Sequence, residues 1–278
     1  MIAELPESAE REDAEQDAGM TVLEHLQELR KRLALALLGT VPGIAVAWYF
    51  KETLLEFLLV PLSRAWLALG MKEPVIHFSN PVDPFIAYLK IAIVAGLLFS
   101  SPWIFWQIWA FVAPGLYRRE RQLAIPFVVG STVFFCGGAF FGYGAVFPPA
   151  FELFLSMAGT LPQGSMDLQA TIMLNEYLNL ATRLLLAFGV VFEIPVAIAF
   201  LSLAGLVNWK QLLRFGRIWV VLSAVLAAML TPPEISSQLM MLVPLVSLYF
   251  LSIGIAYLLG PKPESEPTGG DADEGMAG

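Results

Sequence analysis

The amino-acid sequence predicts an all-α, polytopic membrane protein with six transmembrane helices and both chain termini on the cytoplasmic side. Of its 278 residues, 57% are hydrophobic and only 14% are charged, and the mean hydropathy is +0.69. Soluble domains carry about 25% charged residues, so this composition places the chain in the membrane class. The apolar residues also form long runs, and most Lys and Arg residues lie between these runs.

The runs are long enough to cross a bilayer. A hydrocarbon core of about 30 Å requires about 20 apolar helical residues. The predicted spans lie near residues 33–50, 85–105, 122–147, 178–204, 218–230 and 238–259. The two C-terminal spans are expected to be short, and the fifth covers only about two thirds of the core. We therefore expect either a locally thin membrane or a protected hollow around the fifth span.

Prolines interrupt four of the spans, at Pro42, Pro126, Pro195 and Pro244. Each proline removes a backbone donor and favours a kink in its helix. Two interpretations remain open. The kinks either only shape the packing of the helices, or they bend the molecule so that it opens a concave groove to its partners.

The basic residues predict the orientation of the chain. They cluster at 30–32, 118–121 and 210–217, whereas the connections 148–177 and 231–237 contain no Lys or Arg. Connections rich in Lys and Arg stay in the cytoplasm during insertion. This rule places the N- and C-termini inside and three loops outside.

Two of the outer connections also have an apolar periodicity. Apolar residues at helical spacing fill much of 51–84, and Phe151–Leu155 begin another such stretch. This pattern is typical of short amphipathic helices that lie at the membrane interface.

The two ends of the chain are acidic. Residues 1–19 hold seven Asp and Glu residues against one Arg, and residues 260–278 are rich in Pro, Gly, Glu and Asp. Such segments are expected to be disordered and solvated, so a single transmembrane domain is predicted over 20–259. An acidic N-terminus differs from the basic start of a signal peptide, and we expect no cleaved leader. The scattered basic residues build no face for nucleic acid.

Three ionisable residues lie inside the predicted spans, where each is costly unless it faces protein or water. Glu193 lies near the middle of the fourth span. It is either a packing carboxyl bonded to a neighbouring helix or part of a polar patch inside a hollow. Arg183, about 15 Å away along the same helix, and Lys90 are expected to extend toward the interface.

Two carboxylates are predicted on the cytoplasmic side. Glu28 belongs to the amphipathic segment before the first span, and Glu120 belongs to the connection 109–121. Glu28 can form an ordinary helical pair with Arg32 at i,i+4. Alternatively, the two carboxylates jointly receive a basic ligand, because guanidinium pairs with carboxylate in a bidentate geometry that Lys cannot copy.

No catalytic constellation or cofactor site is predicted. The two histidines, His25 and His77, lie on opposite sides of the membrane, and the single Cys136 excludes an intrachain disulfide. Walker and Gly-x-Ser-x-Gly motifs are absent. Three alternatives remain for such a chain. A small-solute transporter would use Glu193 as its ion site but lacks visible internal repeats. An intramembrane enzyme would need a second group at that depth, and a scaffold would leave the cytoplasmic carboxylates unexplained.

Taken together, the motifs resemble the TatC family, the multispanning core subunits of the twin-arginine protein translocase. The resemblance covers about residues 20–259 and excludes both acidic tails. The matching segments, in order, are His25–Arg32, Ser79-Asn80-Pro81 with Pro84-Phe85, the loop 109–121, Phe188–Pro195, Thr231-Pro232-Pro233 and Ser237-Gln238.

This resemblance implies a non-enzymatic receptor, without a cofactor, for signal peptides that carry two consecutive arginines. It implies a glove-like, concave bundle in the bacterial plasma membrane that associates with further copies of itself. Its expected partners are the single-span subunits TatA and TatB and the signal peptides of folded cargo proteins. Export would be driven by the proton-motive force.

The resemblance also assigns roles to residues. Glu28 and Glu120 would receive the arginine pair, while Leu26, Phe111 and Arg119 would shape the signal-peptide site. The intramembrane polar residue would be Glu193. The residues implied for partner-helix docking are Met229, Thr231 and Gln238. The chain departs from the family pattern at Glu234, where Asp is frequent, and at Arg183, to which the resemblance assigns no role.

Overall fold

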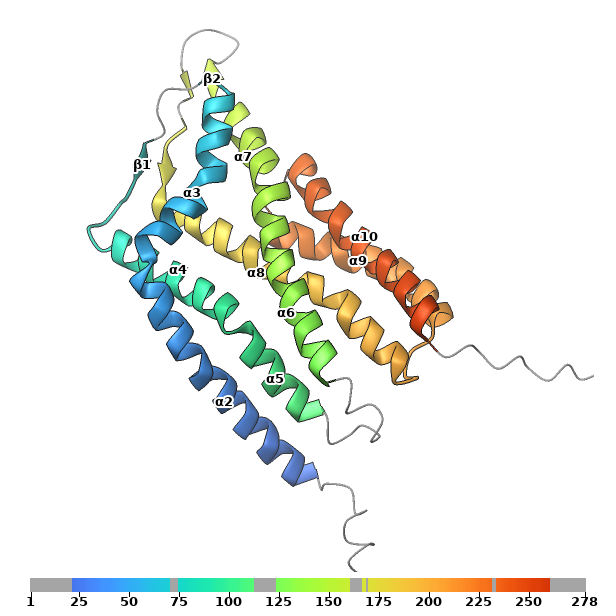
Figure 1. Cartoon of the computed structure of the whole chain (residues 1–278). Helices are drawn as coiled ribbons and strands as arrows, with labels where there is room; N and C mark the ends of the chain where they lie inside the picture. Colours follow the sequence, from blue (N-terminus) through green and yellow to red (C-terminus); the bar gives the residue numbers. More distant parts are fainter. Residues whose placement is uncertain are drawn as a thin grey trace, which may run out of the picture. The chain divides into compact units, whose positions relative to one another are not determined.

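The computed structural model describes residues 22–70, 75–112, 124–160, 167–168, 170–231 and 234–260. This part of the chain is almost entirely helical (Figure 1), and five of its helices are long and apolar enough to span a membrane. A bent helix pair would make a sixth span. The protein is thus an all-α polytopic membrane protein, as predicted, and the count of six spans stays a prediction. Both acidic tails lie outside the described residues.

The contacts divide the chain into two compact units. The first unit comprises residues 1–57 and 80–132, and the second comprises 58–79 and 133–278. The two units are described in turn.

In the first unit, α2 (Val22–Tyr49) packs along α4 (Asp83–Phe99) and α5 (Ser101–Val112). The axes of α4 and α5 are inclined to each other by 57°, with the break at Ser100. Pro102 causes this bend, since it has no N–H to donate to the carbonyl of Leu98. The hydroxyl of Ser101 donates to that carbonyl instead, at 2.8 Å. The bend aligns α5 with the N-terminal half of α2 (Figure 1).

Glycines allow α2 to approach the bent pair closely. A Cβ on Gly96 would lie only 2.6 Å from the Cα of Ile44, and one on Gly43 only 2.8 Å from the carbonyl oxygen of Gly96. Small residues let helix backbones approach each other in membranes. The indole N–H of Trp103 also donates to the carbonyl of Leu35 on α2, at 2.9 Å.

The helices predicted in the outer connections are present. They are α3 (Lys51–Ala68) and α7 (Phe147–Ser156). Their position relative to a membrane interface stays a prediction. Four short strands accompany them: β1 (Ile76–His77) pairs in parallel with β4 (Ile172–Met173), and β2 (Gly159–Thr160) pairs antiparallel with β3 (Asp167–Leu168).

The second unit is built on α8 (Leu174–Leu203), which packs against α10 (Ile235–Leu259) and α9 (Trp209–Leu230). The helix α6 (Ala124–Phe141) begins in the first unit, enters the second unit at Val133, and continues into α7 through the π-helical turn η3 (Gly142–Val146). Pro148 and Pro149 follow this turn and remove two successive donors, which favours the wider i→i+5 bonding.

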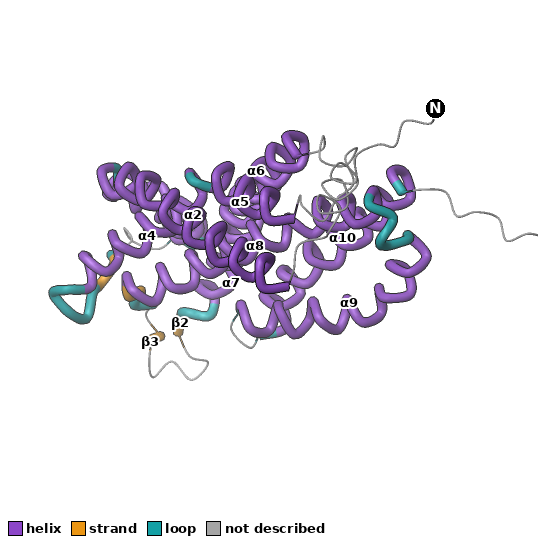
Figure 2. Tube along the Cα trace, turned by 90° about the horizontal axis from the view of Figure 1, so that it is seen from below, coloured by secondary structure: helices purple, strands orange, loops and turns teal. Residues whose placement is uncertain are grey.

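The helix α9 is longer than the apolar run 218–230 on which its prediction rested. It begins nine residues earlier, at Trp209, where Asn208 and Gln211 form a capping box. Its 22 residues correspond to about 33 Å of helix. A short apolar run therefore does not mean a short helix here. Figure 2 shows α9 and α10 as neighbouring helices of similar length.

Candidate functional site

The candidate site lies in the first unit, where the N-terminal end of α2 meets the C-terminal end of α5. The ring of His25 on α2 stacks on the ring of Phe111 on α5, with centroids 4.4 Å apart and planes inclined by 21°. This stacking joins two motifs that are more than 80 residues apart in the chain. Leu26, one of the predicted site residues, lies on the same end of α2 and is 54% exposed.

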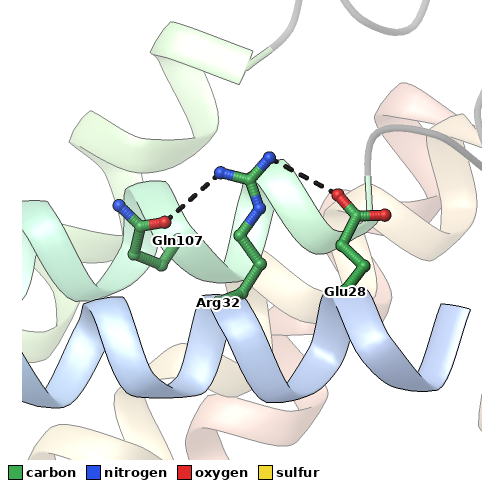
Figure 3. A network of polar contacts seen from close by, with 3 residues as sticks. All are labelled: Glu28, Arg32 and Gln107. Carbon is green, nitrogen blue, oxygen red and sulfur yellow. Dashed lines mark hydrogen bonds and ion pairs between the residues drawn. The ribbon is translucent and has the colours of Figure 1, made fainter. Parts of the chain in front are cut away.

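A polar network of three residues lies beside this aromatic contact (Figure 3). Arg32 donates from Nη2 to Oε1 of Glu28 and from Nη1 to Oε1 of Gln107, and both distances are 3.4 Å. The i,i+4 pair of Glu28 and Arg32 is therefore formed. Gln107 comes from α5 and is only 3% exposed.

The network leaves polar atoms unsatisfied. Among the described residues, Oε2 of Glu28 and Nε of Arg32 are buried and have no hydrogen-bond partner. In Figure 3 this second carboxylate oxygen faces away from Arg32. The two bonds that do form are also longer than the 2.7–2.9 Å typical of charge-assisted bonds. A half-buried carboxylate with a free oxygen can accept an additional cationic donor.

Two of the predicted site residues, Arg119 and Glu120, lie outside the described residues. Their joint action with Glu28 therefore stays a prediction. Gln107 was missed by sequence reasoning, although an amide within the aromatic run Trp103–Trp109 is the kind of signal that could have identified it.

Glu193 lies on α8 in the second unit and is half-buried, with its Oε1 atom buried. The preceding Phe192 packs against Phe141 of α6, with ring centroids 5.3 Å apart. Glu193 is thus a half-buried carboxylate within the long helix α8. Arg183, on the same helix, is exposed.

The three predicted docking residues lie near the turn between α9 and α10. The hydroxyl of Thr231 donates to the carbonyl of Ala227 at 2.9 Å, and the amide of Gln238 donates to the carbonyl of Ala224 at 3.2 Å. Met229 is 75% exposed. The polar residues therefore fix the turn, while Met229 offers an apolar surface beside it. A small, largely enclosed pocket near this turn is lined by residues that include Phe151, Leu184, Thr231, Ser237 and Met241.

Glu234 caps α10 at the same turn. Its carboxylate accepts the backbone N–H groups of Ser236, at 3.0 Å, and of Ser237, at 2.7 Å. These two bonds favour the charged form and lower the pKa of Glu234 below its ordinary value. The residue that departs from the family pattern thus performs the structural task of an N-cap.

No group of three or more His, Cys, Asp and Glu residues that could hold a metal ion occurs in the described part of the chain.

Comparisons with known proteins give a consistent result. The family model described as "Sec-independent protein translocase protein (TatC)" matches residues 24–244. The Sec-independent protein translocase protein TatC of Koribacter versatilis is 36% identical over 245 residues, which cover 88% of each chain. The protein of the same name from Desulforapulum autotrophicum is 38% identical over 243 residues, which cover 87% of this chain and 86% of its own.

A solved structure gives the same result. The crystal structure of the twin arginine translocase receptor TatC superposes with a TM-score of 0.72 at 30% sequence identity, and covers 85% of this chain and 99% of its own. The family match spans far more than half of the chain, and the fold agrees over nearly all of the solved protein. The chain therefore belongs to the TatC family.

Proposed function

We propose that this protein binds twin-arginine signal peptides at the cytoplasmic ends of α2 and α5. Membership of the TatC family makes it a multi-pass membrane component of the Tat translocase in the bacterial inner membrane, and a transport protein rather than an enzyme. A solved relative is described as a receptor. The observation that best supports peptide binding in this chain is the half-buried Glu28, whose Oε2 accepts no hydrogen bond within the described residues.

Charge and shape at this site suit an arginine side chain. A guanidinium can donate two parallel N–H groups to one carboxylate, whereas an ammonium acts as a point charge. One arginine of the signal peptide would bind Glu28, and the other would bind Glu120. The apolar stretch of the peptide would then contact Leu26 and Phe111, with Arg119 shaping the loop side of the site.

The remaining predicted residues belong to the later steps of transport. Glu193 would be the polar group inside the membrane-embedded part of the protein, and Met229, Thr231 and Gln238 would dock the single-span subunits TatA and TatB. With both termini in the cytoplasm and several copies in one complex, the protein would support export of folded proteins driven by the proton-motive force.

Photo-crosslinking in membranes tests the peptide site. A probe at Leu26 or Phe111 should label a peptide with an Arg-Arg motif strongly, and labelling should fall when the motif is Lys-Lys. It should also fall in Glu28→Gln and Glu120→Ala, since removing one partner of a partly buried charge pair typically costs a few kcal/mol.

Glu52→Gln provides the matched control. This exposed glutamate lies in the first turn of α3, beyond the far end of α2, and its neutralisation should leave labelling unchanged. Equal labelling of both peptides, together with full labelling in Glu28→Gln, Glu120→Ala and the double variant, would refute the proposal.

A further inference from the structure

The anionic group of the candidate site is already occupied by a guanidinium of the protein itself. Arg32 contacts Oε1 of Glu28 at 3.4 Å, and the two side chains lie on the same face of α2 (Figure 3). We infer that Arg32 is an internal counter-ion of Glu28 which an incoming arginine displaces, and that Gln107 is the positioning residue that receives Arg32. This inference rests on the proposed function and assigns Arg32 and Gln107 to the same site.

The geometry allows such an exchange with little movement. The guanidinium of Arg32 lies between two acceptors, and its contacts with Glu28 and Gln107 are equally long at 3.4 Å. Both distances exceed the 2.7–3.2 Å of well-formed N–H···O bonds. A small shift toward Gln107 would shorten one bond while it releases the other. The Nε–H group of Arg32 has no hydrogen-bond partner among the described residues and can serve as a further donor during this shift.

Burial explains why the second acceptor is needed. The side chain of Arg32 is 31% exposed and that of Glu28 is 15% exposed. A guanidinium displaced from Glu28 could therefore reach bulk water only if the Arg32 side chain gave up its contacts with the surrounding protein. Gln107 is 3% exposed and fixed on α5. The amide oxygen of Gln107 can accept a bond from the displaced Arg32. Because this amide is neutral, Gln107 does not attract the cationic ligand away from Glu28.

The pair also sets the charge that a ligand meets. Glu28 and Arg32 together are neutral, so the attraction of the site for a distant cation is weaker than that of a bare carboxylate. Displacement of Arg32 costs the same for every ligand of Glu28. The internal counter-ion therefore lowers the affinity of Glu28 for any cationic ligand and does not by itself make the site selective for Arg over Lys.

Peptide titration on the purified full-length protein in lipid nanodiscs tests this exchange. Arg32→Gln should bind an Arg-Arg signal peptide about two- to fivefold more tightly than the wild type, which is the range expected when a partly exposed ion pair no longer competes. Glu28→Gln should bind it much more weakly. Thermal unfolding of each variant reports whether the fold is retained.

A double-mutant cycle tests the role of Gln107. Gln107→Leu should weaken peptide binding in the wild-type background, because the liganded state depends on Gln107 more than the free state does. In the Arg32→Gln background the same change should have no effect on affinity. This coupling is specific to exchange, since a purely structural role of Gln107 would act equally in both backgrounds.

The outcomes separate the two proposals. If Glu28→Gln binds the peptide as the wild type does, Glu28 does not receive the arginine, and both its role in the proposed function and the internal counter-ion are refuted. If Glu28→Gln loses binding while Arg32→Gln binds equally or more weakly, only the internal counter-ion is refuted. Should Arg32→Gln not fold, Arg32→Lys replaces it in the cycle. A single ammonium cannot bridge both acceptors, so in the Arg32→Lys background Gln107→Leu should change peptide affinity only slightly. If Gln107→Leu weakens binding there as much as it does in the wild type, the inference is overturned.

Discussion

The contact between α2 and α5 and the hairpin of α9 and α10 both join two antiparallel helices (Figure 1). The polar side chains of the hairpin have different partners from those where the N-terminal end of α2 meets the C-terminal end of α5. In the hairpin, neutral donors reach backbone carbonyls: Tyr249 donates to Leu212 at 2.8 Å and Gln238 donates to Ala224 at 3.2 Å. At the ends of α2 and α5, the side chains of Glu28, Arg32 and Gln107 pair with one another and at longer distances.

This difference is expected if the hairpin has a structural role and the site at α2 and α5 has the proposed binding role. A backbone carbonyl has a fixed position, so a side chain that donates to it locks two helices in one register. A network of long side chains can exchange partners, and Oε2 of Glu28, which has no hydrogen-bond partner among the described residues, can accept a bond from a ligand. Substitutions in the two regions should therefore have different consequences.

The largest effect is expected where the backbones of the first unit meet. Gly96→Ala would place a Cβ 2.6 Å from the Cα of Ile44 and 2.7 Å from its backbone nitrogen. Neither atom can move without shifting α2, so we expect a loss of about 2–4 kcal/mol in unfolding free energy. Thermal or denaturant unfolding in detergent measures this loss.

Gly137→Ala on α6 is the matched control, because a Cβ there meets no atom within 4 Å. This variant should be as stable as the wild type or more stable by up to about 1 kcal/mol. Equal stability of the two variants would show that the close approach of α2 and α4 does not limit stability.

An intermediate effect is expected inside the hairpin. Tyr249→Phe removes the hydroxyl that donates to the carbonyl of Leu212 but keeps the ring stacked on Trp219, whose centroid is 5.0 Å away. The buried carbonyl would lose this donor, so the unfolding free energy should fall by about 1 kcal/mol. Peptide binding at α2 and α5 should be unchanged. A binding defect without a loss of stability would contradict the division of tasks.

Much of the fold could be predicted because apolar periodicity is a local signal. The helices α3 and α7 follow from the spacing of apolar residues in 51–84 and in the stretch that begins with Phe151–Leu155, although α7 itself begins earlier, at Phe147. The start of α9 could not be predicted from this signal. Lys210, Arg214 and Arg217 lower the local hydropathy, although Lys and Arg are good helix formers. The capping box at Asn208 was the better signal for that boundary.

The candidate site could be predicted only in part, for the same reason. The i,i+4 spacing of Glu28 and Arg32 lies within one helix, so the sequence alone indicates their pairing. The contribution of Gln107 depends on how α5 packs against α2, 75 residues further along the chain. Tertiary contacts of this kind leave no periodic pattern in a single sequence.

A smaller effect, and a dependence on pH, is expected at the cap of α10. Because its native-state pKa lies below the ordinary value of 4.5, charged Glu234 stabilises the folded protein. This contribution is complete above about pH 4.5 and disappears as the pH falls through the lowered pKa. Glu234→Ala should therefore be less stable than the wild type at pH 7, and the difference should shrink toward pH 3 in thermal unfolding. A difference that is constant with pH would show that the carboxylate charge does not act as the cap.

The smallest effect is expected at Ser223, which is the exception within the hairpin. Its Oγ is fully buried yet makes no hydrogen bond within the described residues. Ser252, equally buried on α10, donates to the carbonyl of Leu248 at 2.6 Å. Ser223→Ala should therefore change the unfolding free energy by less than about 0.5 kcal/mol, whereas Ser252→Ala should lower it by about 1 kcal/mol. If Ser223→Ala costs as much as Ser252→Ala, the hairpin depends on a polar contact of Ser223, and satisfied hydrogen bonds would no longer distinguish it from the binding site.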